Sequence, residues 1–134
     1  MSRSYEGSCL CGATRYRVSG TARVGICHCR SCRLASGAQN VAWAIFERSA
    51  FSVTRGELAF FHSSPEVRRG YCGSCGTTLS FETEQRPADV DLTLATLEDP
   101  DDLKPECHVW VSHKLPWVTI TDGLRQFSKD ADAD

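Results

Sequence analysis

The sequence shows no long hydrophobic run and no surplus of positive charge. No stretch approaches the roughly 18 consecutive apolar residues of a membrane span, and the first residues, Met-Ser-Arg-Ser-Tyr-Glu-Gly, are mostly polar. We therefore expect no signal peptide and a cytoplasmic location. With 15 basic and 17 acidic side chains, the net charge of −2 gives no general reason to bind nucleic acid or anionic membranes.

Helical periodicity is scarce as well. Residues 5–12 are expected to start as a short strand and then turn, and the continuous apolar run at 41–46 predicts a buried strand. Further strands are predicted at 14–18, 51–54, 58–61, 67–71, 78–82, 90–97, 108–111 and 117–120, with 51–61 as a hairpin. One helix is expected at 29–36, ended by Gly37. We therefore predict a mainly β, antiparallel fold with little helix. It forms a single domain over residues 1–127, followed by a small, charged, disordered tail at 128–134.

Cysteine, in contrast, is abundant. The eight thiols occur at Cys9, Cys11, Cys27, Cys29, Cys32, Cys72, Cys75 and Cys107. Without an export signal a disulfide framework is not expected, and thiols two or three residues apart are poor disulfide partners but good ligands of one ion. A redox dithiol at Cys72 and Cys75 would need a thioredoxin-like βαβ context, which the sequence does not suggest.

Two of these groups suit a closed metal site. Cys9-x-Cys11 and Cys72-x-x-Cys75 each precede a glycine that permits a tight turn, a zinc-knuckle pattern. Four thiolates would saturate a tetrahedral Zn²⁺, which would then be structural. From spacing alone this pairing is one option, and buried free thiols are the other.

The densest group, Cys27-x-Cys29-x-x-Cys32, suits an open site. A helix starting at Cys29 would place two of its thiols on one face, near a helix N-terminus that favours thiolates. Three ligands leave one position for a reactant, unless His28 or Cys107 closes the site. Three thiolates on Zn²⁺ suit an incoming thiol, which would lose its proton on binding, so the pattern favours thiol chemistry over hydrolysis.

Five segments carry a family resemblance, in order along the chain: 7–13, 27–33 with Gly37, 63–65, 69–77 and 105–110. Together they resemble the glutathione-dependent formaldehyde-activating enzyme family, which includes centromere protein V. The similarity extends from about Glu6 to Phe127. It implies a β-tent, in which antiparallel sheets are clasped by zinc.

The resemblance also implies two Zn²⁺ ions per chain. The structural ion would be held by Cys9, Cys11, Cys72 and Cys75, and the catalytic ion by Cys27, Cys29 and Cys32. The implied activity is that of a carbon–sulfur lyase, which joins glutathione and formaldehyde reversibly as S-(hydroxymethyl)glutathione. A small thiol such as glutathione is the expected partner.

Other polar residues are candidates for substrate contacts. Glutathione carries carboxylates, and Arg30 and Arg33 flank the open site, so we expect them to bind substrate, with solvated surface positions as the alternative. Arg68 and Arg69 precede the second knuckle and have the same two interpretations. His108 is a candidate general acid or substrate contact, with core packing as the alternative.

A second class of function also fits the cysteine pattern. The protein could be a non-catalytic, zinc-stabilised binding or scaffold module, which would carry a basic or aromatic surface patch. The sequence shows no basic cluster. Trp110 or Trp117 could wall a pocket, although core packing is the simpler expectation for both.

Overall fold

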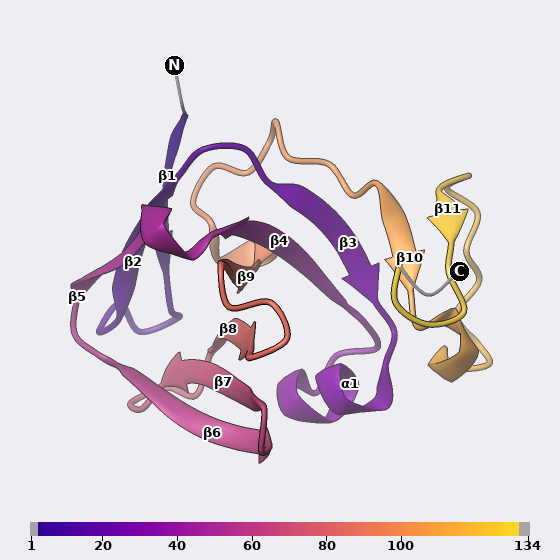
Figure 1. Cartoon of the computed structure of the whole chain (residues 1–134), viewed down its shortest axis with the longest axis horizontal. Coiled ribbons are helices and arrows are strands. Elements are labelled where there is room, and N and C mark those ends of the chain that lie inside the picture. The colour runs from indigo at the N-terminus through magenta and orange to yellow at the C-terminus, as the bar shows by residue number, and fades with distance from the viewer. Residues whose placement is uncertain (1–2, 132–134) are drawn as a thin grey trace.

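The computed structural model describes residues 3–131 and is built from two sheets (Figure 1). The smaller sheet is antiparallel, with the strand order β1-β2-β5. Its strands are β1 (Ser4–Ser8), β2 (Arg15–Ser19) and β5 (Phe51–Arg55). The mainly β prediction is confirmed.

The larger sheet contains eight strands in the order β11-β10-β3-β4-β9-β8-β7-β6. They are β3 (Arg23–Cys27), β4 (Val41–Glu47), β6 (Leu58–Ser64), β7 (Val67–Cys72), β8 (Thr78–Thr83), β9 (Asp89–Thr93), β10 (Cys107–Val109) and β11 (Arg125–Gln126). Pairing is antiparallel except at one edge, where β10 runs parallel to both β3 and β11. A parallel pair needs a long connection, and β10 reaches β3 from far along the chain.

Helix is confined to short segments, as expected. The α-helix α1 (Arg30–Ser36) follows β3, and Figure 1 places it below the ends of β3 and β4, beside β7 and β8. The described residues also contain the 3-10 helices η1 (Arg48–Ala50), η2 (Leu94–Thr96) and η3 (Val111–His113). None of the helices within residues 3–131 has the length and apolar character needed to cross a membrane.

The core lies between the two sheets. Tyr5 and Tyr16 of the smaller sheet pack with Phe46, Leu79 and Leu92 of the larger one, all at most 5% exposed. Within the smaller sheet, Gly7 of β1 leaves room for the ring of Tyr16 on β2, because a Cβ at Gly7 would lie 2.1 Å from that ring. The two sheets therefore share one apolar interior.

The predicted hairpin at 51–61 is wrong. β5 pairs with β2 and β6 pairs with β7, so the turn between them carries the chain from one sheet to the other. Gly56 in that turn has φ +69°, and a Cβ there would lie 2.2 Å from the carbonyl oxygen of Ala13. The turn packs against the β1–β2 connection instead of folding β5 back onto β6.

Two other predicted strands differ from the structure. The strand predicted at 90–97 ends at Thr93, where the hydroxyl of Thr96 donates to the Thr93 carbonyl (2.8 Å) and η2 begins. Residues 117–120 form no strand. Instead, the Val118 amide closes a turn on the Leu115 carbonyl, and Lys114 Nζ binds the Val118 carbonyl at 2.6 Å.

The disorder predicted for 128–134 does not begin at residue 128. The carbonyls of Ser128 and Lys129 accept hydrogen bonds from the amides of Ser112 and Trp110, and Asp130 accepts one from Trp110 Nε1. The preceding pairing of β11 with β10 brings this segment to η3. Residues 132–134 lie outside the described residues.

Candidate metal centres

The first cysteine group lies where the two sheets meet. Cys9 and Cys11 stand in the β1–β2 connection, and Cys72 and Cys75 stand at the end of β7 and in the turn before β8. Their four Sγ atoms lie within 4.8 Å of one another. The Cys9–Cys11 and Cys11–Cys72 sulfur distances are 3.7 and 3.8 Å. A tetrahedral ion with Zn–S bonds of about 2.3 Å requires about 3.8 Å, so this four-sulfur cluster fits zinc.

The two halves of the four-sulfur cluster are built alike. The Cys9 amide donates to the Thr14 carbonyl, and the Cys72 amide donates to the Thr77 carbonyl, both at 3.0 Å. Backbone amides also point at sulfur, with Thr14 N 3.3 Å from Cys9 Sγ and Cys75 N 3.5 Å from Cys72 Sγ. These donors stabilise thiolates, so each turn is prepared to hold an ion.

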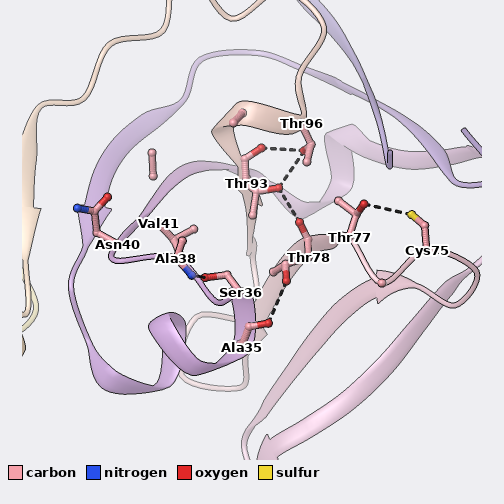
Figure 2. A pocket seen from close by; sticks show the side chains of 13 residues that line it. Ala35, Ser36, Ala38, Asn40, Val41, Cys75, Thr77, Thr78, Thr93 and Thr96 are labelled. Atoms are coloured by element: carbon pink, nitrogen blue, oxygen red, sulfur yellow. Dashed lines mark hydrogen bonds between the residues drawn. The ribbon is translucent and has the colours of Figure 1, made fainter. Parts of the chain in front are cut away.

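Thr77 links the halves. Its hydroxyl lies 3.2 Å from Cys75 Sγ, and Figure 2 marks this contact with a dashed line. The hydroxyl also accepts a hydrogen bond from the Leu10 amide at 3.0 Å. Hydrogen bonds from the Thr77 hydroxyl and amide, and from the Cys11 amide, lower the pKa of Cys75 to about 5. Cys75 is thus set to act as an anionic ligand.

The second group is a three-sulfur cluster at the start of α1. Cys27 ends β3, Cys29 is the N-cap of α1, and Cys32 lies in its first turn. Their Sγ atoms lie within 4.8 Å of one another. The predicted helix is confirmed, and Gly37 ends it with φ 71° and an amide bonded to the Arg33 carbonyl.

Cys29 caps the helix α1 with its sulfur. Its Sγ accepts the Cys32 amide at 3.3 Å, which makes the sulfur a helix cap. Hydrogen bonds from Cys27 and Cys32, then from that amide, lower the pKa of Cys29 to about 2, although burial opposes the shift. The cluster therefore offers a thiolate at a helix N-terminus, where negative charge is favoured.

Within residues 3–131, this cluster has no fourth protein ligand. His28 is fully buried, and its Nε2 lies 2.8 Å from His108 Nδ1. Cys107 on β10 faces Gly25 of β3, where its sulfur lies 3.5 Å from the position of a Cβ. Neither residue joins the three sulfurs. The donor set leaves one position of a tetrahedral ion to an outside ligand.

A hydrogen-bonded chain of two buried histidines and the exposed Asp122 supports the loop between Cys27 and Cys29. Asp122 accepts from His108 Nε2 at 2.7 Å, so His108 Nδ1 is left to accept from His28 Nε2. The His28 amide donates to the Val109 carbonyl at 3.0 Å. The bond from His108 lowers the pKa of Asp122. Sequence reasoning missed Asp122, because a single loop aspartate has no local signal.

The candidate substrate arginines differ in their surroundings. Arg30 is exposed and Arg33 is half-buried. Arg68 pairs with Glu82 at 3.0 Å, away from the sulfurs. Arg69, by contrast, is buried and reaches Cys32.

Aromatic and aliphatic side chains surround the three-sulfur cluster. Trp43 and Val41 form a buried group with its cysteines, and Phe81 and Trp110 pack against that group. Trp110 has φ 56°, the one positive value at a non-glycine among the described residues. Trp117 is 69% exposed and lies outside this wall.

A groove of about 460 Å³ lies between α1 and the second knuckle (Figure 2). Its hydroxyl groups already have partners. Thr78 Oγ1 donates to the Ala35 carbonyl at 3.2 Å, and Thr93 Oγ1 donates to the Thr78 carbonyl at 2.9 Å. The first bond attaches α1 to β8 and the second joins β9 to β8, so these hydroxyls stabilise the fold.

Comparison with known proteins places the chain. A family model described as "Glutathione-dependent formaldehyde-activating enzyme" matches residues 4–113. An uncharacterised lyase of Schizosaccharomyces pombe is 31% identical over 78 residues, which span 58% of this chain and 56% of that protein. A crystal structure of a Rhodobacter sphaeroides protein has a TM-score of 0.60 at 23% identity, covering 91% of this chain and 98% of that one, and so shares the fold. The chain belongs to the glutathione-dependent formaldehyde-activating enzyme family.

Proposed function

We propose that the protein is a zinc-dependent carbon–sulfur lyase acting on the adduct of glutathione, or a similar small thiol, with an aldehyde such as formaldehyde. The observation that carries the proposal is the three-sulfur cluster, which is one ligand short of a tetrahedral site. The family assignment supports the substrates, and the name of the yeast relative supports a lyase reaction. The chain spans about half the length of that relative. The activity of this chain is therefore a proposal of its own.

Each cluster has its own role in this proposal. The four-sulfur cluster holds a structural Zn²⁺, because saturated coordination leaves no place for a reactant. The three-sulfur cluster holds the second ion, which would lower the pKa of an incoming thiol and orient it. In the forward direction the thiol sulfur bonds to the carbonyl carbon, and its proton passes to the aldehyde oxygen. The reverse reaction breaks that C–S bond.

The chain's own residues prepare this chemistry. The Cys32 amide and the start of α1 stabilise the Cys29 thiolate. Trp43, Phe81 and Trp110 limit the access of water to the cluster. His108 has both ring nitrogens engaged, with His28 and Asp122. Those contacts favour His108 as a positioning residue over the general acid expected from sequence.

Arg30 remains our candidate for contact with a substrate carboxylate. It is exposed at the first position of α1, directly after the ligand Cys29. Arg33 lies one turn further along, half-buried, and its Nε has no hydrogen-bond partner among the described residues. We propose Arg30 as the outer contact and Arg33 as the weaker candidate.

Metal content tests the two-site arrangement. Purified protein should contain about two zinc ions per chain, and a mild chelator should remove one of them first. Cys29→Ser should lose the labile ion, and Cys107→Ser, a matched control outside both clusters, should keep both. A single tightly held ion in the wild type would overturn the proposal.

Thiol binding tests the chemistry. Titration with millimolar glutathione should shift the amide resonances of residues 27–32, whereas S-methylglutathione, which lacks the free thiol, should not. With formaldehyde added, exchange between free and adduct glutathione should be faster with wild type than with Cys29→Ser. If glutathione leaves these resonances unchanged, the lyase proposal fails and the binding-module alternative gains.

A further inference from the structure

Arg69 of β7 is a buried cation at the edge of the three-sulfur cluster. Arg69 is only 7% exposed to solvent. Nη1 and Nη2 lie 3.6 and 3.7 Å from Cys32 Sγ, and Nε donates to Ser63 Oγ at 3.1 Å. The guanidinium carbon lies 5.0 Å from the centre of the Phe81 ring. The guanidinium is therefore fixed from three sides.

A buried cation requires a nearby anion, because its removal from water is unfavourable unless it is paired. Among residues 3–131, no carboxylate forms an ion pair with Arg69. The preceding residue, Arg68, does have such a partner in Glu82. The partner of Arg69 is the sulfur of Cys32.

We propose that Arg69 is a positioning residue that sets the charge of the second metal site. The inference rests on the proposed function. Three thiolates on a divalent ion leave a net charge of −1, and a thiolate as fourth ligand would raise it to −2. The fixed guanidinium offsets one of these charges while its fork holds Cys32 in place. It therefore favours an anionic fourth ligand over a neutral one.

This selectivity distinguishes Arg69 from a substrate-carboxylate contact. A contact of that kind would act only on thiols that carry a carboxylate. A charge effect acts on any thiolate, including one from an otherwise uncharged molecule. It should leave a neutral ligand such as imidazole almost unaffected.

The test uses protein loaded with Co²⁺, whose absorption bands report each added ligand. The probes are 2-mercaptoethanol and imidazole. Arg69→Met should weaken binding of 2-mercaptoethanol by about tenfold or more, and imidazole binding should stay within about twofold. Arg69→Lys should restore part of the loss, because it returns the charge without the fork. Arg68→Met, the matched control, should bind both probes as the wild type does.

Ser63→Ala covers the case in which Arg69→Met fails to fold or to hold Co²⁺. It keeps the charge but frees Nε, and we expect a smaller loss limited to 2-mercaptoethanol. Equal losses for both probes, or none in any Arg69 or Ser63 variant, would overturn the inference. If wild-type protein itself takes no thiol, the proposed function fails. If it does and the variants match it, only the role of Arg69 fails.

Discussion

The two cysteine clusters use the same ligand atom in different surroundings. The four-sulfur cluster joins turns from different sheets, and its ligands are held by backbone amides and Thr77. The three-sulfur cluster sits on one strand and one helix and is backed by buried polar side chains from β7 and β10. In the proposed function, the number of sulfurs and the elements that carry them separate a structural ion from an ion with room for a reactant.

The largest expected effect is on folding. If the four-sulfur cluster holds the proposed structural ion, Cys72→Ser should abolish its binding and destabilise the protein by at least about 5 kcal/mol, enough to unfold an ordinary domain. Cys29→Ser should leave a folded protein with one ion, because the shared core of the two sheets does not include the three-sulfur cluster. Circular dichroism and metal analysis of both variants provide the measurement. A folded Cys72→Ser protein with one ion would show that the roles are misassigned.

Alkaline pH should lower the free energy of unfolding through Tyr16, which lies in the smaller sheet. The β1–β2 connection of that sheet carries half of the four-sulfur cluster. Burial raises the pKa of Tyr16 to about 12, above the value near 10 of an unfolded chain. The folded state therefore retains the proton longer. This contribution to stability is complete below about pH 10 and is lost as the pH rises towards 12, by up to about 3 kcal/mol.

Urea unfolding at a series of pH values measures this loss. Tyr16→Phe has no group to titrate, so its stability should fall less steeply over the same range. Tyr71→Phe, at a surface position, should keep the wild-type slope. Equal slopes for Tyr16→Phe and the wild type would contradict the prediction.

The support of the three-sulfur cluster can be tested at His108. His108→Phe removes both imidazole bonds and leaves the buried Nε2 of His28 unpaired, which should lower the free energy of unfolding by about 2 kcal/mol. Amide exchange should rise at residues 27–29 and stay unchanged in the four-sulfur turns. His62→Phe, on the exposed edge strand β6, should change neither. Uniformly faster exchange would indicate a general loss of stability.

The smallest effect should come from Thr77. Thr77→Val loses the hydroxyl that contacts Cys75 Sγ and the Leu10 amide, which should destabilise the protein by about 1 kcal/mol. Chelator competition should show faster release of the tightly held ion, with the labile ion unaffected. Thr21→Val, at an exposed position, should behave like the wild type. A change in the labile ion alone would contradict the separation of the two sites.

What the sequence predicts well is local. Residues two or three apart must share a turn or a helix face, so the cysteine groups and α1 follow from their spacing. Most strand positions follow from alternation. The hairpin between β5 and β6 is wrong, because two short strands joined by a glycine turn look the same whether they pair or separate.

The supporting residues could not be found in this way. His28 and His108, or Cys32 and Arg69, are far apart in sequence and meet only because the order of strands brings them together. Asp122 lies in a loop without a motif. Both arginines before the second knuckle look alike in sequence, but one faces Glu82 and the other faces the cluster. Which of the two arginines contacts the cluster depends on which face of β7 is buried.

The parallel pairing of β3 with β10 has a consequence for synthesis on the ribosome. All four cysteines of the four-sulfur cluster have been synthesised once residue 75 is added. β10, which backs the three-sulfur cluster, begins at Cys107, 32 residues after Cys75, which is a few seconds of elongation at roughly 5–20 residues per second. The four-sulfur cluster can thus be complete on the nascent chain before the residues of β10 that pack against the thiols at 27–32 have been synthesised.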